Sequence, residues 1–559
     1  MIRSREEVLG RLRSGRGLAG ETIEGVDLDR LSASGADLTG AVFRGCSARD
    51  ASFSRATLRG ARFLRVDFAR ADFTGIDGAG LRADPEGKGT ESSFWAARFD
   101  RASLAGADLS AALLSEASFT GADLTPAVFK NVRAVRAAME SAVLRRADLT
   151  GADLASAVLE GAALDEAQGA GVILESANLR GAGMRDAVFD GAKLAGALLA
   201  EADLTGARLS GANLTGADLT GVDLTDATLE RAVLDKAILP NARFIRADLT
   251  GAQLLSTVGM GVVFAGAKLA GARFKGKDLG LVDFAEADLT GADLASVTMP
   301  LASFPSAVLA RANLSGAALE GADFTRADLR GADVRGATLN QAKLAEALLD
   351  GVDLRRARLV KVRLSRADLT RVKLAGAALL DSLLDEVRAG GVDFSGCDLT
   401  DSMLAGASLA RCNFSQAVLR QTSFAGADLR RANLSGARGL RANLAGACLD
   451  EAQLKQADLD DAALDRAVMR NADAEGARFE TARFKGADLR GTVFRDAVLT
   501  RADLSGAALD ECDLRRAKLD GADLHRTSRT GADLSGASLD DVRETDPARA
   551  RAEDYRPKV

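Results

Sequence analysis

Hydrophobic and polar residues follow one another along this chain with a period of five. The stretch 201–220, EADLTGARLSGANLTGADLT, contains four copies of one five-residue unit. Its positions are a small residue, then in most copies Asp or Asn, then Leu, then Ser or Thr, and in most copies Gly. Neither an amphipathic helix, with a period of 3.6, nor a flat strand, with a period of 2, produces this spacing. A fixed short period indicates a chain that stacks similar units instead of folding around one central core.

The two apolar positions of each repeat are restricted in size. Counted in steps of five from Phe99 to Leu539, 89 central positions follow without insertion or deletion, and 77 of them are Leu or Phe. Ala stands two residues before most of these centres. A short extended segment that points both residues inward, followed by a turn on the polar or glycine residues, satisfies the pattern. Four such sides would close a square coil of about twenty residues.

With this A(D/N)LxG pattern over nearly its whole length, the chain resembles the pentapeptide repeat proteins. The resemblance implies an all-β solenoid, a right-handed quadrilateral β-helix of pentapeptide repeats. Coils at the usual strand separation rise about 4.8 Å each, so roughly 22 coils would span on the order of 100 Å. Stability would be summed from coil to coil through Leu and Phe ladders and backbone hydrogen bonds.

Residues 4–14, SREEVLGRLRS, form the one clearly helical pattern. Ser4 and Glu7 make a capping box, and Val8 lies on a short apolar face. The first coil of a β-helix has unpaired backbone groups and a bare core. We therefore expect a short N-terminal α-helical cap, with docking on a partner as the alternative role.

The repeat register divides the chain into five parts. Repeats begin near Ile23 and are regular from Phe394 almost to the end. The parts are an N-terminal capping helix at 1–20, a first pentapeptide-repeat block at 21–78, a loop insertion at 79–94, a long pentapeptide-repeat β-helix at 95–540 and a charged C-terminal tail at 541–559.

The interval between Phe73 and Phe99 breaks the register, because its 26 residues are one more than five repeats need. It contains GAGLRADPEGKGTESS, whose glycines, Pro85 and charges such as Lys88 are typical of a surface loop. The GKGT within it lacks the spacing of a phosphate-binding loop. We expect an insertion, with a binding element or a hinge as alternatives, and expect Trp95 to pack where the second block starts.

Equivalent sides should recur every twenty residues, so Phe residues at that spacing should stack as one internal ladder. Those residues are Phe244, Phe264, Phe284, Phe304 and Phe324. The same segment contains the poorest repeats, because Gly259 occupies a centre and Lys277 is the only charged residue at a small inward position. Since a buried ammonium is costly without a partner, we expect Lys277 to escape outward through a local bulge rather than to act in catalysis.

Several outward positions that should be polar are apolar. This candidate protein interface consists of Met260, Leu281, Pro300, Leu301, Val360 and Leu380. An apolar stripe on an otherwise charged surface is a candidate partner site. Single apolar residues are also common on protein surfaces, so ordinary surface scatter is the alternative.

The cysteines and the C-terminal end call for no special chemistry. Four cysteines replace Ala at the small inward position and are expected to fill the core: Cys46, Cys397, Cys412 and Cys512. Cys448 is outward, and no spacing typical of a metal site or a disulfide framework occurs. The only histidine, His525, is expected to point outward, Arg529 replaces a core residue, and the tail is expected to be disordered or to lie loosely over the last coil.

Charge and motifs narrow the classes of function. Lys and Arg total 73 against 79 Asp and Glu, a net charge of -6, which is weak for a mimic of DNA. In windows of about a hundred residues no strong single-sign field occurs, which also argues against nucleic-acid binding. The chain contains no run of about 18 apolar residues, the length needed to cross a membrane. Its N-terminus lacks the apolar core of a signal peptide, so a cytoplasmic protein is expected. No catalytic, metal-binding or cofactor motif is found, so we expect no enzyme activity and no cofactor.

The remaining prediction is a rigid protein-interaction scaffold or adaptor in bacteria. Its short N-terminal helix and repeat texture are similar to those of large repeat proteins encoded with type VI secretion machinery, which implies an accessory role there. The alternative that the family resemblance implies is a DNA mimic that binds a type II topoisomerase, DNA gyrase. The sequence specifies neither the partner protein nor the oligomeric state.

Overall fold

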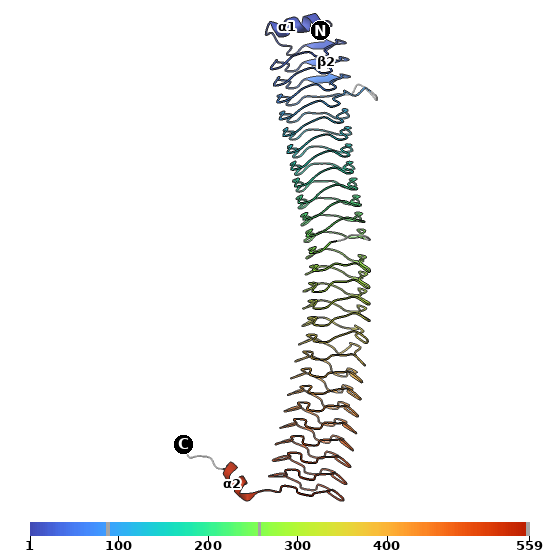
Figure 1. Cartoon of the computed structure of the whole chain (residues 1–559), viewed down its shortest axis with the longest axis vertical. Helices are drawn as coiled ribbons and strands as arrows, with labels where there is room; N and C mark the ends of the chain where they lie inside the picture. The colour runs from blue at the N-terminus through green and yellow to red at the C-terminus, as the bar shows by residue number, and fades with distance from the viewer. Residues whose placement is uncertain (85–89, 255–258, 555–559) are drawn as a thin grey trace. The chain divides into compact units, whose positions relative to one another are not determined.

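The computed structural model describes residues 1–84, 90–254 and 259–554. It divides into two compact units, each a stack of four-sided coils (Figure 1). The first unit consists of Met1–Phe274 and Val282–Asp288, and the second of Lys275–Leu281 and Leu289–Val559.

Successive coils pair in parallel at a spacing of twenty residues. Strands β1 (Thr22–Glu24), β2 (Val42–Arg44) and β3 (Arg62–Leu64) form one parallel sheet in which Thr22 pairs with Val42 and Val42 with Arg62. Single parallel bridges continue the same spacing in both units, as between Asp203 and Asp223. The predicted all-β solenoid, a right-handed quadrilateral β-helix with a short N-terminal helix, is confirmed.

Every backbone N–H of a typical repeat, Ala202 to Gly206, has an acceptor. The N–H groups of Asp203, Leu204 and Gly206 donate to carbonyls of the adjoining coils at 3.0, 2.7 and 2.8 Å, and that of Ala202 closes a turn at 2.9 Å. The remaining N–H, that of Thr205, donates to Oδ1 of Asp203 at 3.1 Å. Because a buried or half-buried donor needs a partner, the recurrent Asp or Asn is a structural acceptor.

Each side of a coil ends in a turn that needs a residue with positive φ. In one such turn the Ala207 N–H donates to the Leu204 carbonyl at 2.9 Å, and Gly206 has a φ of 70°. These are features of a type II turn, in which glycine is favoured at the third position. Other residues adopt this left-handed conformation at a cost of roughly 1–2 kcal/mol each.

The core of each unit is a set of side-chain ladders. All 22 Phe residues of the chain are buried. In the first unit the ring of Phe264 lies 5.0 Å from that of Phe244 and 5.3 Å from that of Phe284. In the second unit the rings of Phe304 and Phe324 stack at 4.7 Å. The predicted aromatic ladder is therefore confirmed within each unit.

The register break is an insertion into a single coil. Asp67 pairs with Ser93 across 26 residues instead of twenty, so six residues are extra. Leu81 and Phe94, both within the predicted 79–94 loop, are buried at coil positions, so the insertion is shorter than the sequence pattern indicated.

The coils stack without interruption across this insertion. The rings of Phe73 and Phe99, on its two sides, stack at 4.7 Å with an interplanar angle of 3°, which is not the arrangement of a hinge. Pro85 and Lys88, which the sequence placed in the loop, lie outside the described residues.

Trp95, predicted to pack where the second block starts, lies there at the surface and contacts Arg70. Phe94 fills the central position, and Trp95, the next residue along the chain, is 42% exposed. The guanidinium carbon of Arg70 lies 5.8 Å from the centre of the indole ring, close enough for a cation–π contact. Trp95 is therefore held at the surface beside the insertion.

Helix α1 (Arg5–Arg13) covers the N-terminal coil (Figure 1). The predicted cap is confirmed, since the Ser4 side chain accepts a hydrogen bond from the Glu7 N–H at 3.2 Å. Val8 is buried, and Ile2 pairs with Ile23 of β1 and so extends the sheet by one residue. The helix and the preceding residues thus cover the open end of the β-helix.

Of the two expectations for the C-terminal tail, disorder or a tail that lies loosely over the last coil, the described residues are nearer to the second. Residues Pro547–Asp554 form helix α2. Arg549 pairs with Asp523 of the coils at 3.1 Å, and Arg526 pairs with Asp554 at 2.6 Å. These charge pairs, which the tail composition alone did not indicate, attach the helix to the coils before it.

His525 is buried, so the prediction that it points outward is wrong. Only 2% of its surface is exposed. Its Nδ1 accepts a hydrogen bond from the Asp546 N–H at 3.2 Å, and its Nε2 lies 3.2 Å from a carboxylate oxygen of Glu553. Both ring nitrogens are therefore engaged by the residues around α2, and neither is available as a catalytic base.

Reactivity toward a thiol reagent is expected to be confined to Cys448 in the native protein. Burial raises the pKa of Cys397 and Cys412 to about 11 and that of Cys512 to about 12, and it also raises the pKa of Cys46. Cys448 is only half-buried. Since the thiolate is the reactive form, labelling with mass spectrometry should find Cys448 alone until the protein is unfolded. Native labelling of the other four would contradict their role as core fillers.

Candidate functional site

Two exposed leucines at one corner of the second unit depart from the repeat pattern. Leu281 is 58% exposed and Leu301 is 65% exposed. Both occupy the left-handed turn position, with φ of 58° and 59°. Among the described non-glycine residues with positive φ, these two are the only large apolar ones, and the others are Ala or polar. A large apolar residue at this position is unfavourable for two reasons: its backbone is in a conformation that bulky side chains rarely adopt, and its apolar surface is exposed to water.

The two leucines and Pro300 form the leucine corner, as we name it here. Pro300 precedes Leu301 in the same turn and is exposed. The side chain of Leu301 extends over Gly321 in the next coil, where an added Cβ would lie 2.6 Å from Leu301 Cδ2. Because Gly321 has no side chain, the side chain of Leu301 can lie directly over its backbone.

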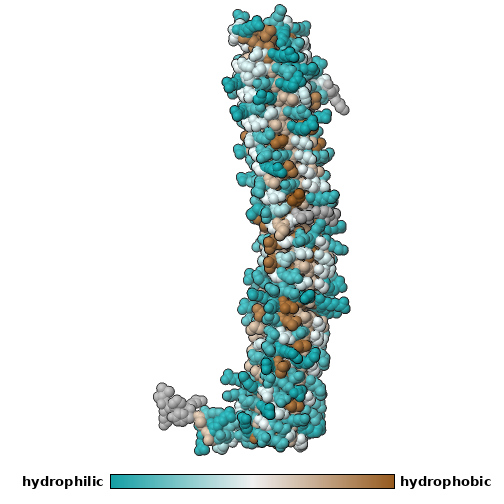
Figure 2. Space-filling view, viewed as in Figure 1, coloured by the Kyte–Doolittle hydropathy of each residue, from teal (hydrophilic) through white to brown (hydrophobic). Residues whose placement is uncertain are grey.

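The other residues of the predicted interface are placed differently. Val360 and Leu380 belong to the second unit but are half-buried, so they offer little apolar surface. Met260 is 62% exposed and belongs to the first unit. Figure 2 shows hydrophobic side chains in small groups among hydrophilic ones on the face in view. The structure thus supports the leucine corner more than a continuous stripe.

The two irregular repeats have structural explanations. Gly259 is buried, and an added Cβ would lie 2.9 Å from Leu239 Cβ and 2.8 Å from Val262 Cγ2, so a side chain has no space there. At Lys277 the predicted bulge is wrong. The Lys277 carbonyl accepts the Thr298 N–H at 2.8 Å in the regular register, and the residue is half-buried. A long aliphatic stem permits this without displacing the backbone.

One coil carries an excess of positive charge that the sequence analysis missed. Residues 354–373, which we call the cationic coil, contain eight Lys or Arg and one Asp, a net charge of +7 from 8 − 1. The preceding coil, 334–353, has 2 − 3 = −1, and the following coil, 374–393, has 1 − 4 = −3. The basic residues are Arg355, Arg356, Arg358, Lys361, Arg363, Arg366, Arg371 and Lys373. A window of a hundred residues averages this charge away, whereas a window of one coil reveals it.

Some of these cations are paired and others are not. Arg355 donates from Nε and Nη2 to the two carboxylate oxygens of Asp353 at 2.9 and 2.7 Å, and this interaction lowers the pKa of the Asp353 carboxyl. Arg356, Arg358 and Arg363 are exposed and have no carboxylate partner among the residues that the structure describes. The cationic coil therefore offers free guanidinium groups at its surface.

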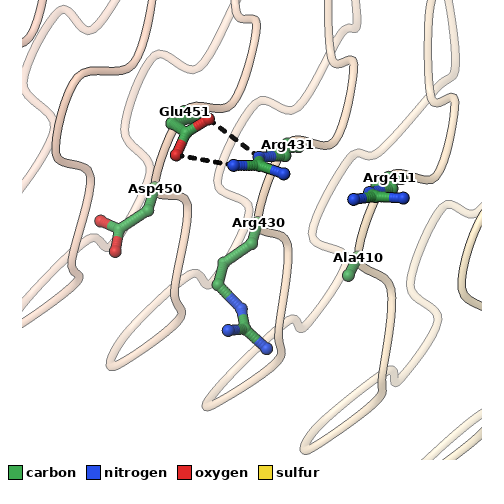
Figure 3. A pocket seen from close by; sticks show the side chains of 6 residues that line it. All are labelled: Ala410, Arg411, Arg430, Arg431, Asp450 and Glu451. Atoms are coloured by element: carbon green, nitrogen blue, oxygen red, sulfur yellow. Dashed lines mark hydrogen bonds and ion pairs between the residues drawn. The ribbon is translucent and has the colours of Figure 1, made fainter.

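A surface pocket of about 460 Å³ lies on later coils of the second unit (Figure 3). Arg431 pairs with both carboxylate oxygens of Glu451 at 2.8 and 3.1 Å, as the dashed lines in Figure 3 show. Arg430 is held by Asp428 at 2.8 and 2.7 Å. Of the three arginines, only Arg411 has no carboxylate partner among the described residues, and a single guanidinium does not define a ligand site.

The described residues contain neither a cluster typical of a metal site nor a helix that could span a membrane. No group of three or more His, Cys, Asp or Glu among them could hold a metal ion. No helix in the part of the chain that the structure describes is long and apolar enough to cross a bilayer.

The chain belongs to the pentapeptide repeat family, described as Pentapeptide repeats (8 copies), whose model matches most of its length. The matched segments are 24–75, 92–133, 122–161, 147–186, 182–221, 223–254, 263–299, 302–341, 339–376, 363–401, 399–436, 447–486, 477–516 and 509–543. Pentapeptide repeat proteins are generally structural or interaction proteins rather than enzymes.

Two solved structures illustrate what the chain is similar to. One is QnrB1, a plasmid-mediated fluoroquinolone resistance protein, with 19% identity, 35% of this chain and 95% of that chain covered, and a TM-score of 0.23. The other is HetL, involved in heterocyst differentiation regulation in the cyanobacterium Nostoc, with 29% identity, 47% and 96% covered, and a TM-score of 0.17. No curated protein sequence matches the chain. Family membership therefore rests on the repeat match.

Proposed function

We propose that this chain is a non-enzymatic scaffold that binds a partner protein at the leucine corner. The observation that carries the proposal is the pair Leu281 and Leu301, exposed and held at left-handed turn positions where glycine or a polar residue is favoured. Such a pair is unfavourable for the isolated protein. Burial under a partner would recover roughly 1.5–3 kcal/mol per leucine side chain.

The setting that we propose is bacterial and cytoplasmic, with the chain as an accessory component of a type VI secretion system. This part of the proposal is supported only by the resemblance of the N-terminal helix and the repeat texture. Recovery of secretion-system proteins with the native chain would support it, and their absence from the recovered partners would overturn it.

The DNA-mimic alternative has less support in the structure. A mimic must present its carboxylates to the partner. Here the recurrent Asp residues are turned toward their own backbone, as Asp203 is toward the Thr205 N–H, and others pair with arginines, as Asp353 does with Arg355. A gyrase supercoiling assay that showed inhibition or protection by this protein would favour the mimic over the scaffold.

The test of the scaffold is a pull-down with a variant whose folding is secure. Asn tolerates the left-handed conformation better than Leu, so Leu281→Asn with Leu301→Asn should keep or raise the melting temperature while the partner is lost. The matched control is Gln341→Asn, which lies in the same column of turns with a φ of 61°. Cross-linked pull-downs from native cells that recover the same proteins with wild type and the double variant would overturn the proposal.

A further inference from the structure

We propose that the cationic coil is a docking surface for an extended acidic segment of a partner protein. Carboxylates of that segment would bind Arg358 and Arg363, which flank a single corner of the second unit. Lys361 lies in the turn between them and already meets Asp381 at 3.5 Å. This surface is distinct from the leucine corner, and its test does not depend on that corner having a partner.

The first argument is the environment of Arg363. In the parallel register Arg363 pairs with Lys343 of the preceding coil and with Leu383 of the following coil. Like charges directly opposite on paired strands destabilise a sheet. Lys343 has its own carboxylate, Asp323, at 3.0 Å, whereas Arg363 has none among the described residues. A bound carboxylate would supply the missing counter-charge.

The second argument is the contrast with the usual handling of charge in this chain. A cation commonly meets a carboxylate one coil away: Arg70 meets Asp50 at 2.7 Å, and Arg146 meets Glu166 at 2.8 Å. Arg358 instead lies between Thr338 and Ala378, neither of which carries a negative charge that could pair with the guanidinium. Arg358 and Arg363 therefore lack the pairing with a neighbouring coil that these cations have, and they lie close together in one coil.

The third argument is the shape and chemistry of the corner. Arg358 and Arg363 hold outward positions on adjacent sides, and Lys361 holds the turn between them with a φ of 59°. Half-buried Val360 lies in the same turn, and Leu380 follows at the equivalent position of the next coil. Arginine forks bind carboxylates in a bidentate manner, and an extended peptide places alternate side chains on one face. An extended acidic segment matches the two arginines, and Val360 and Leu380 add only a small apolar contact beside them.

A protein segment fits better than a nucleic acid. The positive charge is confined to one coil, and the neighbouring coils carry net charges of −1 and −3 by the counts given above. A nucleic-acid strand has one charge about every 3.4 Å and would meet these carboxylates on both sides. Base stacking also needs exposed aromatic rings, and in the second unit every described aromatic residue is a buried Phe.

The experiment measures binding of a short fluorescent peptide of Glu and Leu residues to the full chain, next to its Gln counterpart and to single-stranded DNA of equal charge. We expect salt-sensitive binding of the acidic peptide, with loss of about tenfold or more in Arg363→Glu and in Arg358→Glu. The matched control is Arg311→Glu, the same charge change at an exposed residue of the second unit outside the cationic coil.

Stability gives a second, independent readout. Glu at position 363 would lie opposite Lys343, so Arg363→Glu should melt at a higher temperature than wild type while it loses the peptide. The proposal is overturned by absence of peptide binding to wild type, by equal binding to the Arg363→Glu variant, or by tighter binding of DNA than of peptide. A lower melting temperature of Arg363→Glu would overturn the argument from like-charge repulsion.

Discussion

Replacement of Phe264 by alanine is expected to destabilise the first unit by about 3–5 kcal/mol. The ring is 1% exposed and lies between the rings of Phe244 and Phe284 at 5.0 and 5.3 Å. Truncation removes its burial and leaves a cavity in a ladder that cannot collapse, because coils above and below are fixed by backbone hydrogen bonds. Chemical denaturation should show this loss as a lower denaturant midpoint for the unfolding of the first unit.

The location of the damage is as informative as its size. In a repeat fold each coil contacts only its neighbours, so hydrogen exchange should accelerate in the coils next to Phe264 and not at α1. The control is Phe264→Leu, which restores the default residue of the central position and should cost less than about 1.5 kcal/mol. Equal effects of the two substitutions, or uniform loss of protection throughout the first unit, would contradict a ladder whose stability is summed coil by coil.

The coil itself could be predicted because its physical cause is local. Each repeat contains its two inward residues, its turn residue and the Asp that accepts the N–H two residues on, as Asp203 does for Thr205. None of these requirements involves a residue distant in sequence, so a period of five specifies them completely. The same logic explains why the helical cap at Ser4 and Glu7 was predicted correctly.

The features that the sequence did not reveal depend on contacts between different coils. His525 is buried because α2 returns to the coils and engages both ring nitrogens, and no local pattern shows that return. Trp95 lies outward because Phe94, five residues before Phe99, occupies the central position of that repeat. The positive charge of the cationic coil is confined to the twenty residues of one coil, a length that only the fold defines.

The two candidate surfaces share one physical feature. Leu281 and Leu301 are apolar where the turn favours polar residues or glycine, and Arg363 is charged where its neighbour has the same charge. Each residue departs from the preference of its position, and Arg363 has no carboxylate partner among the described residues to offset this. Such local conflicts are expected at sites that a partner completes, because selection for binding there opposes selection for stability.

Substitution of Gly169 by leucine is expected to destabilise the first unit by about 1–3 kcal/mol, although leucine is the usual residue at its central position. A Cβ added at Gly169 would lie 2.3 Å from Cε1 and 2.4 Å from Cδ1 of Phe189, the equivalent residue of the next coil. The Phe189 ring thus fills the space that Gly169 leaves empty. The two residues form a size-matched pair across neighbouring coils.

A double-mutant cycle tests this pairing. Phe189→Leu alone should also destabilise, because the smaller side chain leaves a void above Gly169. Combining the two restores leucine on leucine, as in ordinary coils, so the double variant should approach wild-type stability with a coupling energy of about 1–3 kcal/mol. Melting temperatures of the four proteins decide the matter. Additive losses would mean that Gly169 and Phe189 do not share one space, and a stable Gly169→Leu single variant would mean that the ring moves aside at little cost.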